Sequence, residues 1–434
     1  MPQRYVGGAA PFLALFLWSS WVSAQTVDSR AGEIEAARAQ KAQTIQPPEP
    51  AKKGFGDRVG SVVNVLGLRS GATGFRVKVG GVVSTGGFAP AGLEYRRPDL
   101  AGGEVLFKGR AQVSFRRFQK YDLQFGLPGL WGDRAFLMAY SVRHDYPGMN
   151  YYGPGPDTRK TFRSNYRLEN TGFNGTAGVR PFSLLSIGVS LGYLFVNVGP
   201  GTDSRFVSSE KVFTPVEAPG IDRQANFLSQ VGFIQFDYRD NPKGPRSGGN
   251  YTVEYGRYLD KTLGLHDFRR VDIYLQQYIP FFNQQRVIVL NGKSVLTFPK
   301  AGQTVPFYLQ PTLGGAEDLR GFRARRFYEN NMIAVSAEYQ WRAYRFLDLA
   351  LFADAGKVFP RRAQWNFKDV ESSVGFGLRF NLSDNSPFLR ADVGFSHEGF
   401  QVWLRFSNVF GDRAAGPVIH SDFVDGRGTN ANRY

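Results

Sequence analysis

Side chains that could carry catalysis are few and scattered in this sequence. Its four histidines, His144, His266, His397 and His420, stand far apart, and there is no cysteine among the 434 residues. Ser396 precedes His397 directly, but neighbours on a strand point to opposite faces. The serine-hydrolase, phosphate-loop and zinc-protease patterns are missing. The sequence therefore predicts no enzyme and no catalytic, cofactor or metal site.

A second chemistry, ion pairing in an enclosed space, is indicated by the segment GGAEDLRGFRARRF, residues 314–327. An arginine taken out of water needs a carboxylate, and a two-pronged arginine–carboxylate contact would pin the loop that carries it. The candidate partner of Arg320 is Asp354 in LFADAGKV, on the same strand face as Phe352 and opposite Leu351. The alternative is that Arg320 is solvated and Asp354 caps a turn.

Glycines next to these residues fit the same interpretation, because Gly321 permits close backbone approach and Gly356 leaves room on the strand. The other arginines of the segment are predicted to be plain lumen or loop charges. The candidate loop lock therefore comprises Arg320, Gly321, Phe322, Phe352, Asp354 and Gly356.

The elements that must position these residues are strands, because apolar and polar residues alternate strictly from about Gly74 onward. Phe75, Val77 and Val79 alternate with Arg76 and Lys78. A similar face near the C-terminus holds Phe400, Val402, Leu404, Phe406 and Phe410. The opposite faces are rich in Arg, Lys, Gly and Gln, which favours a water-filled lumen over the aliphatic interior of a soluble sandwich.

The fold class predicted is all-β, a sixteen-stranded antiparallel transmembrane β-barrel over residues 74–410. Residues 160–182 fit one long strand or two, and sixteen is the best count. Connections alternate between compact turns (126–133, 240–249, 281–285, 382–387) and long loops (146–160, 199–225, 299–327). Short turns face the periplasm in such barrels and long loops face outside. Residues 299–327 are then the sixth outer loop, tucked inward.

The flanking segments indicate export. Residues 1–24 have a basic start, an apolar centre and Val22-Ser23-Ala24 before the cleavage point, which is typical of a signal peptide. Residues 25–73 are expected to be a periplasmic extension, partly helical or disordered, and residues 411–434 a polar tail. The formal net charge of +16 raises nucleic acid as a partner, but basic residues that alternate along strands line a lumen and predict no nucleic-acid binding.

Four segments resemble the superfamily of outer-membrane barrels that includes the BamA and TamA insertases, two-partner secretion transporters and bacterial surface antigens. DLRGF (318–322) resembles its sixth-loop motif, LFADAGKV (351–358) its strand motif, and YYGPGPDT (151–158) a third-loop signature. DYRDNPKGPRSGGNY (237–251) resembles its hairpin motif, with Asp237, Arg239, Asp240 and Pro242 in place. From the residues alone, this hairpin is a tight turn in which Arg239 and Asp240 bond across the mouth.

Two departures from the family pattern stand out. The chain continues for 24 residues after Phe410, where the family barrel ends. The 49 residues of 25–73 are too few for a typical polypeptide-transport-associated domain, so a barrel-only member is expected.

The resemblance implies a barrel in the outer membrane of a Gram-negative-type bacterium that inserts or translocates polypeptide or lipid. The expected partners are outer-membrane lipids, unfolded outer-membrane or secreted polypeptides, and periplasmic chaperones. The mechanism would use a weak seam between the first strand (75–83) and the last (400–410), where strand edges can part. The alternatives are a loop-plugged channel for small anions and a surface adhesin with long loops.

Overall fold

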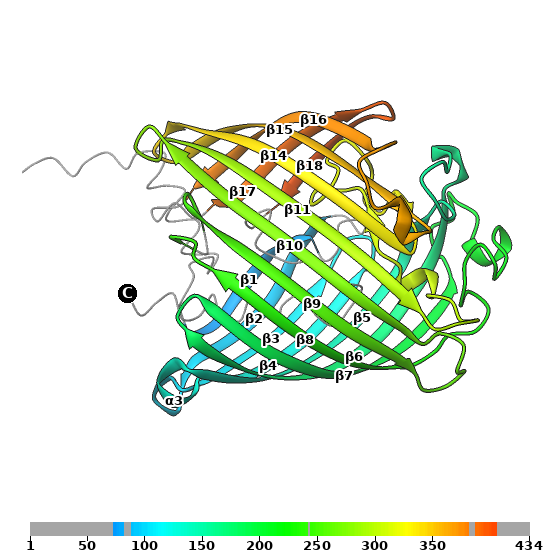
Figure 1. Cartoon of the computed structure of the whole chain (residues 1–434), viewed down its shortest axis with the longest axis horizontal. Coiled ribbons are helices and arrows are strands. Elements are labelled where there is room, and N and C mark those ends of the chain that lie inside the picture. The colour runs from blue at the N-terminus through cyan, green and yellow to red at the C-terminus, as the bar shows by residue number, and fades with distance from the viewer. Residues whose placement is uncertain (1–72, 82–87, 242–243, 382–386, 406–434) are drawn as a thin grey trace, which may run out of the picture. The chain divides into compact units, whose positions relative to one another are not determined.

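A single curled antiparallel sheet dominates the computed structural model, which describes residues 73–81, 88–241, 244–381 and 387–405. Sixteen strands follow one another around it, each paired with the next along the chain (Figure 1). Their bounds are β1 Gly74–Gly81, β2 Phe88–Leu100, β3 Val105–Val113, β4 Gln119–Gly129, β5 Ala135–Tyr151, β6 Ser164–Phe182, β7 Leu185–Pro200, β8 Phe227–Asp237, β9 Gly248–Asp260, β10 Phe268–Phe281, β11 Arg286–Pro299, β14 Asn331–Tyr344, β15 Leu347–Phe359, β16 Glu371–Asn381, β17 Pro387–Ser396 and β18 Gly399–Arg405. The predicted count of sixteen antiparallel strands is confirmed.

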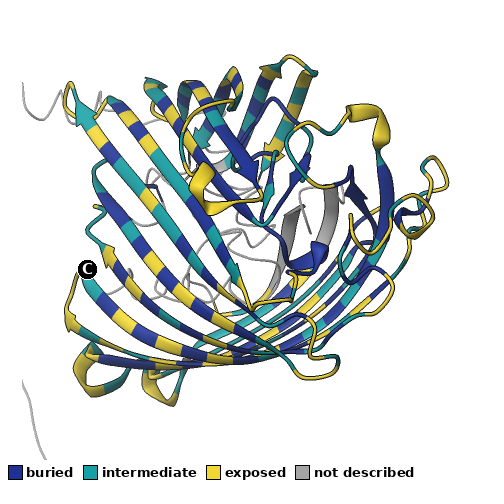
Figure 2. Ribbon diagram, turned by 45° about the vertical axis from the view of Figure 1, so that its right-hand side comes forward, coloured by how far each residue is buried: buried dark blue, intermediate teal, exposed yellow. Residues whose placement is uncertain are grey.

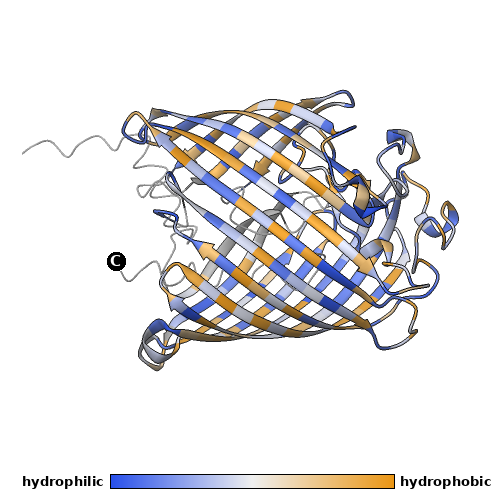
Figure 3. Ribbon diagram, in the orientation of Figure 1, coloured by the Kyte–Doolittle hydropathy of each residue, from blue (hydrophilic) through white to orange (hydrophobic). Residues whose placement is uncertain are grey.

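More buried and more exposed residues alternate along most of the strands whose side chains are described, as the bands of Figure 2 show. In β7, Ser186 and Ser190 are buried, whereas Val189 and Leu191 between and beyond them are 61% and 60% exposed. Hydrophobic and hydrophilic residues alternate along the strands (Figure 3). Many exposed residues at mid-strand are apolar, among them Leu123, Val253 and Leu351. Polar inside and apolar outside is the pattern of a barrel whose outer wall contacts lipid.

Compact turns close one end of the sheet, called here the turn side, and longer connections lie at the other end, the loop side. The loops used below are loop 3 (152–163), loop 4 (201–226), loop 6 (300–330) and loop 7 (360–370). Loop 6 contains the small pair β12 (Thr312–Leu313) and β13 (Phe327–Tyr328). The short helical turns are η1 Ala101–Gly103, α3 Leu130–Asp133, η2 Lys160–Phe162, η3 Ser209–Lys211, η4 Phe307–Leu309 and η5 Arg362–Gln364.

The bounds of β5 and β6 refine the strand limits predicted from the sequence. Residues 164–182 form the single strand β6, which settles the open choice between one strand and two. The predicted loop 146–160 begins too early, because β5 continues to Tyr151 and its last residues pair with Ser164 and Asn165. Because β5 and β6 are 17 and 19 residues long, they extend beyond the apolar middle of the sheet, and loop 3 begins at their far ends.

The two ends of the sheet are strand edges. β1 pairs with β2 and β18 pairs with β17, and no pairing joins β1 to β18 within the described ranges. In the described residues, no helix combines the length and apolar character needed to cross a membrane. The predicted signal peptide, extension and tail lie outside the described residues, as do Pro242, Phe406 and Phe410.

Candidate functional site

Loop 6 enters the lumen and packs against the wall formed by β11, β14 and β15. Leu319 and Phe322 are fully buried there in an apolar cluster. Its other members are Val295, Leu313, Phe327, Met332, Ala334 and Val358. This apolar contact brings the loop backbone to the barrel wall, so the side chain of Arg320 reaches the strands without crossing solvent.

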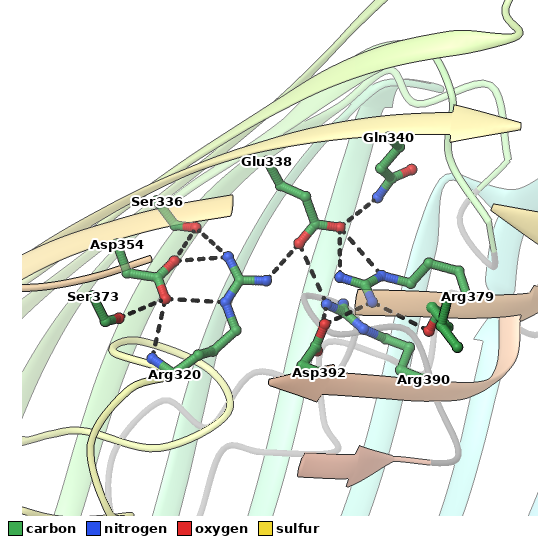
Figure 4. A network of polar contacts seen from close by, with 10 residues as sticks. Arg320, Ser336, Glu338, Gln340, Asp354, Ser373, Arg379, Arg390 and Asp392 are labelled. Carbon is green, nitrogen blue, oxygen red and sulfur yellow. Dashed lines mark hydrogen bonds and ion pairs between the residues drawn. The ribbon is translucent and has the colours of Figure 1, made fainter. Parts of the chain in front are cut away.

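Arg320 contacts Asp354 of β15 through three hydrogen bonds (Figure 4). Its Nε donates to Oδ2 at 3.0 Å and its Nη2 to Oδ1 at 2.7 Å, while its backbone N–H donates to Oδ2 at 3.0 Å. The guanidinium also lies 3.4 Å from the ring centroid of Phe352. The structure thus brings together the arginine, carboxylate and aromatic ring named from the sequence.

A second carboxylate, Glu338 of β14, was not anticipated. Arg320 Nη1 donates to its Oε2 at 2.5 Å, and Arg379 of β16 donates to its Oε1 at 2.8 Å. Arg390 and Asp392 of β17 extend the chain of contacts, with Arg379 and Asp392 2.6 Å apart and Arg390 and Asp392 3.0 Å apart. We call the set Arg320, Glu338, Asp354, Arg379, Arg390 and Asp392 the lumen network.

Charges within the lumen network balance one for one, with three guanidinium groups and three carboxylates, and every side chain is at most 3% exposed. Ser336 and Ser373 donate further hydrogen bonds to Asp354. Buried charges are tolerated only when paired and hydrogen-bonded, and removal of one partner leaves an uncompensated charge. Loop 6 therefore supplies one of the charges that the wall requires.

Close backbone approach explains two glycines at this contact. A Cβ on Gly394 of β17 would collide with the carbonyl group of Arg320 and lie 2.7 Å from the nitrogen of Gly321. A Cβ on Gly321 would lie 2.6 Å from the carbonyl oxygen of Phe395. Gly356, also named from the sequence, faces the backbone of β14, where an added Cβ would lie 2.7 Å from the oxygen of Ile333.

Loop 6 also contacts the last described strand. The indole nitrogen of Trp403 in β18 donates to the carbonyl oxygen of Arg320 at 2.8 Å. Arg405 of the same strand pairs with Glu317 at 2.9 Å, and Ser396 at the end of the neighbouring β17 donates to the carbonyl oxygen of Gly321. The loop that is fixed by the lumen network thus supports the strand that borders the open edge.

At the loop side, aromatic residues of loop 6 pack against β5 and β6. Tyr151 and Tyr166 each lie about 5 Å, centroid to centroid, from Phe307, and Tyr151 contacts Tyr328 edge-on. We call Tyr151, Tyr166, Phe307, Tyr308 and Tyr328 the outer aromatic cluster, and all five are buried. The phenol groups of Tyr151 and Tyr328 donate to the carbonyl oxygens of Glu217 and Asn150. Through these contacts the cluster joins loop 4 and loop 6 to the loop-side ends of β5 and β6.

Arg326, predicted to be a plain charge, is buried and joins three segments. It donates to Glu398 at 2.8 Å and to the hydroxyl of Thr158 at 2.8 Å, and its guanidinium lies 4.7 Å from the ring of Tyr152. Tyr152 and Thr158 belong to the segment that resembled a third-loop signature. Loop 6 therefore contacts this segment through Arg326, four residues beyond the sixth-loop motif.

The hairpin between β8 and β9 is described over residues 238–241 and 244–247. Asp240 bonds across the mouth by accepting from the backbone nitrogens of Arg246 and Ser247. Arg239 makes a bidentate contact with Asp237 at 2.7 and 2.9 Å, two residues back on its own chain segment. The cross-mouth hydrogen bonds assigned to Asp240 are present, and those of Arg239 to Asp237 run along the strand.

The seam residues lie on the two edge strands. Phe75 of β1 is 72% exposed, and Phe400, Val402 and Leu404 of β18 are 57–63% exposed on the outer face. Val77 and Val79 lie in β1, where the backbone is described. Strand alternation predicted this outward face.

Comparison with known proteins identifies the family. Residues 100–401 match the model of the Omp85 superfamily domain. Among solved structures, BamA from Haemophilus ducreyi lacking POTRA domains 1-3 aligns with a TM-score of 0.56 at 18% identity, over 76% of this chain and 69% of that one. CdiB from Escherichia coli aligns with a TM-score of 0.54 at 12% identity, over 78% of this chain and 63% of that one.

A sequence comparison with curated proteins gave no match. The family match covers more than half of the 434 residues, and both structural neighbours share the fold. The chain therefore belongs to the Omp85 superfamily, and it is an outer-membrane β-barrel of the insertion or translocation class.

Proposed function

We propose that this protein assists unfolded polypeptides into or across the outer membrane at the seam between β1 and β18, without catalytic chemistry. The proposal rests on the two edge strands, β1 and β18, which are not paired with each other within the described residues. An unpaired edge presents backbone N–H and C=O groups, which can template an incoming β-strand. The clients would be outer-membrane or secreted polypeptides, delivered by periplasmic chaperones.

Within the described residues, the contacts that loop 6 makes to the seam lie on its β18 side. Its contacts to β18 run through Trp403 and Arg405, while the lumen network fixes the loop to β14, β15, β16 and β17. Separation of the edges then requires β1 to move relative to a braced β18. A braced strand edge is suited to pair with a client strand in a defined register.

The lumen supports this role over the passage of small anions. The three arginines of the lumen network are matched by three carboxylates, so they form no uncompensated basic filter. The outer aromatic cluster packs rings of loop 6 against β5 and β6 at the loop side.

A disulfide across the seam tests the proposal, and the cysteine-free sequence offers a clean background. Cysteine pairs, one in β1 and one in β18, are scanned for the pair that oxidises, because a disulfide requires Cα atoms within about 7 Å. We expect the oxidised barrel to fold but to lose client insertion or secretion, and reduction to restore it. The readout is the amount of folded outer-membrane protein, or of secreted protein, in cells that depend on the variant.

The matched control is a disulfide between β9 and β10, at the facing residues Val253 and Ile273. It adds the same kind of cross-link between two strands that are already paired with each other. Full client handling by the seam-locked barrel would contradict the proposal.

A further inference from the structure

Two arginines face each other on the outer wall of the barrel without any counter-charge. Arg257 of β9 and Arg269 of β10 are direct register partners, and both are exposed. Within the described residues neither side chain makes a hydrogen bond, ion pair or cation–π contact. Like charges directly opposite on paired strands are destabilising, so this arrangement favours an anion between them.

A third arginine continues the row along the wall. Phe298 of β11 is the register partner of Arg269, and the guanidinium of Arg362 in loop 7 lies 4.4 Å from the centroid of its ring. Loop 7 is held against this wall, since Arg362 donates to the carbonyl oxygen of Thr297 and Trp365 donates to the hydroxyl of Ser294. Arg257, Arg269 and Arg362 form what we call the wall patch.

The carboxylates of the adjoining connection 261–267 and its flanks are already engaged. Asp260 accepts hydrogen bonds from the backbone nitrogens of Thr262, Leu263 and Leu265. Asp267 accepts from the backbone nitrogen of Asp260 and lies 3.8 Å from Lys300. Neither carboxylate pairs with the wall patch.

A different arrangement is found at the loop-side ends of β5 and β6, in another part of the wall. Arg167 pairs with Asp145 at 2.8 Å and with Glu169 at 3.0 Å, and Arg143 lies 3.9 Å from Glu169. Outward-facing arginines are therefore balanced by carboxylates there. Uncompensated positive charge is a property of the wall patch and not of the loop-side rim as a whole.

The wall patch lies where the outer wall changes from apolar to charged. Tyr255 and Val253, which follow Arg257 down the outward face of β9, are 50% and 46% exposed. Arg257 stands two residues, about 7 Å, beyond Tyr255 along the strand. In an outer-membrane barrel, side chains at this border lie at the level of lipid headgroups, with aromatic residues beside them.

We propose that the wall patch binds the phosphate of an anionic lipid in the leaflet that surrounds the loop side of the barrel. Arginine presents a planar fork that grips phosphate in a bidentate manner, and the two facing guanidinium groups would share one phosphate. The acyl chains would lie along the apolar faces of β9 and β10 below. This site is separate from the seam, and its failure would leave the proposed function standing.

Binding is measured on the purified full chain in detergent by native mass spectrometry, with lipid A bisphosphate as the probe. We expect one retained lipid A per barrel, and at least about a tenfold weaker affinity in the R257Q/R269Q variant, since hydrogen bonds to charged groups are each worth tenfold or more. The matched control is R143Q/R167Q, which removes two outward arginines at the same end of the barrel and should bind as the parent does.

Three outcomes would overturn the proposal. They are equal affinity in R257Q/R269Q and the parent, an equal loss in R143Q/R167Q, and retention of dephosphorylated lipid A as tightly as the bisphosphate. Inorganic phosphate serves as the competitor, and displacement of the lipid at equal concentration would show a free-anion site instead of a lipid site.

Thermal unfolding in lipid-free detergent gives an independent readout. Because the facing arginines repel each other, R269Q alone should raise Tm by on the order of 1 °C when no lipid is present. Added lipid A should raise Tm of the parent more than that of R269Q. A lower Tm for R269Q in plain detergent, or equal shifts with lipid A, would contradict the site.

Discussion

The lumen network and the outer aromatic cluster both hold loop 6, but by opposite kinds of contact. The network consists of charges that are almost fully buried and hydrogen-bonded in fixed directions (Figure 4). The aromatic cluster consists of packed rings, with a few phenol groups bonded to backbone carbonyls. Burial of apolar surface is non-directional and tolerates small shifts, whereas buried ion pairs accept few geometries.

The two regions therefore contribute differently to the stability and the position of loop 6. The aromatic cluster supplies apolar burial at the loop side, and the network sets the position of the loop along the wall. We infer that the network contributes position more than stability, because buried ion pairs often add little net free energy. Substitutions in either the lumen network or the outer aromatic cluster can separate the two contributions.

The largest effect is expected for Arg320→Ala. Loss of the guanidinium leaves Asp354 and Glu338 buried without their shared partner, which costs about 3–5 kcal/mol. The measurement is the free energy of unfolding in urea, followed by tryptophan fluorescence. Arg323→Ala in the same loop is the control, since Arg323 is partly exposed and should change stability by less than about 0.5 kcal/mol. Equal stabilities of the two variants would refute the lock.

A smaller effect is expected for Gly394→Ala, which tests position without changing any charge. The added methyl would collide with the carbonyl of Arg320, so either loop 6 or β17 must shift. Overpacking of this kind costs about 1–3 kcal/mol. Increased protease cleavage of loop 6 at unchanged barrel fold would report the displacement, and Gly232→Ala, where open space surrounds the site, should behave as the parent.

In the outer aromatic cluster, Tyr328→Phe keeps the ring and removes the phenol that donates to Asn150. The expected loss is about 1 kcal/mol, the net worth of one hydrogen bond. Urea unfolding again measures it. A loss as large as that of Arg320→Ala would show that the cluster is as directional as the network.

The smallest effect is expected for Asp203→Asn in loop 4. The hydrogen bond from Arg205 lowers the pKa of Asp203 to about 2, and Arg116 pairs with the same carboxylate at 2.6 Å. A depressed acid pKa stabilises the folded state above the unfolded value near 4, and this contribution is lost as the pH falls towards 2. Because the arginine partners of Asp203 are exposed to solvent, the loss in Asp203→Asn should be less than about 1 kcal/mol at pH 7. A difference in Tm between variant and parent that persists at pH 2 would argue against this cause.

Strand alternation was enough to predict the barrel, its sixteen strands and the inward direction of Asp354 and Phe352. The partner of Arg320 on β15 also followed, because a buried arginine requires a carboxylate. Glu338 and Arg379 were missed, although each lies on the buried parity of its strand, because alternation gives the face of a residue but not its height in the barrel. Register between strands decides which inward charges meet.

Other differences have a similar origin. The extent of β5 was underestimated because Pro147 and Gly148 suggested a loop, whereas pairing with β6 resumes beyond them at Met149. Arg326 was taken for a plain charge because its partners, Thr158 and Glu398, are far away in sequence. Long-range contacts of this kind depend on curvature of the whole sheet, which no local pattern encodes.

The central claim is that clients meet the barrel at its seam. A photo-reactive amino acid at Phe75 on the outer face of β1 tests it most directly, with the same residue at Leu191 of β7 as the matched position on a closed wall. Both sites are well exposed, at 72% and 60%. The account predicts covalent adducts with newly exported polypeptide from position 75 and none from position 191. Equal adducts at both positions, or none at position 75, would contradict it.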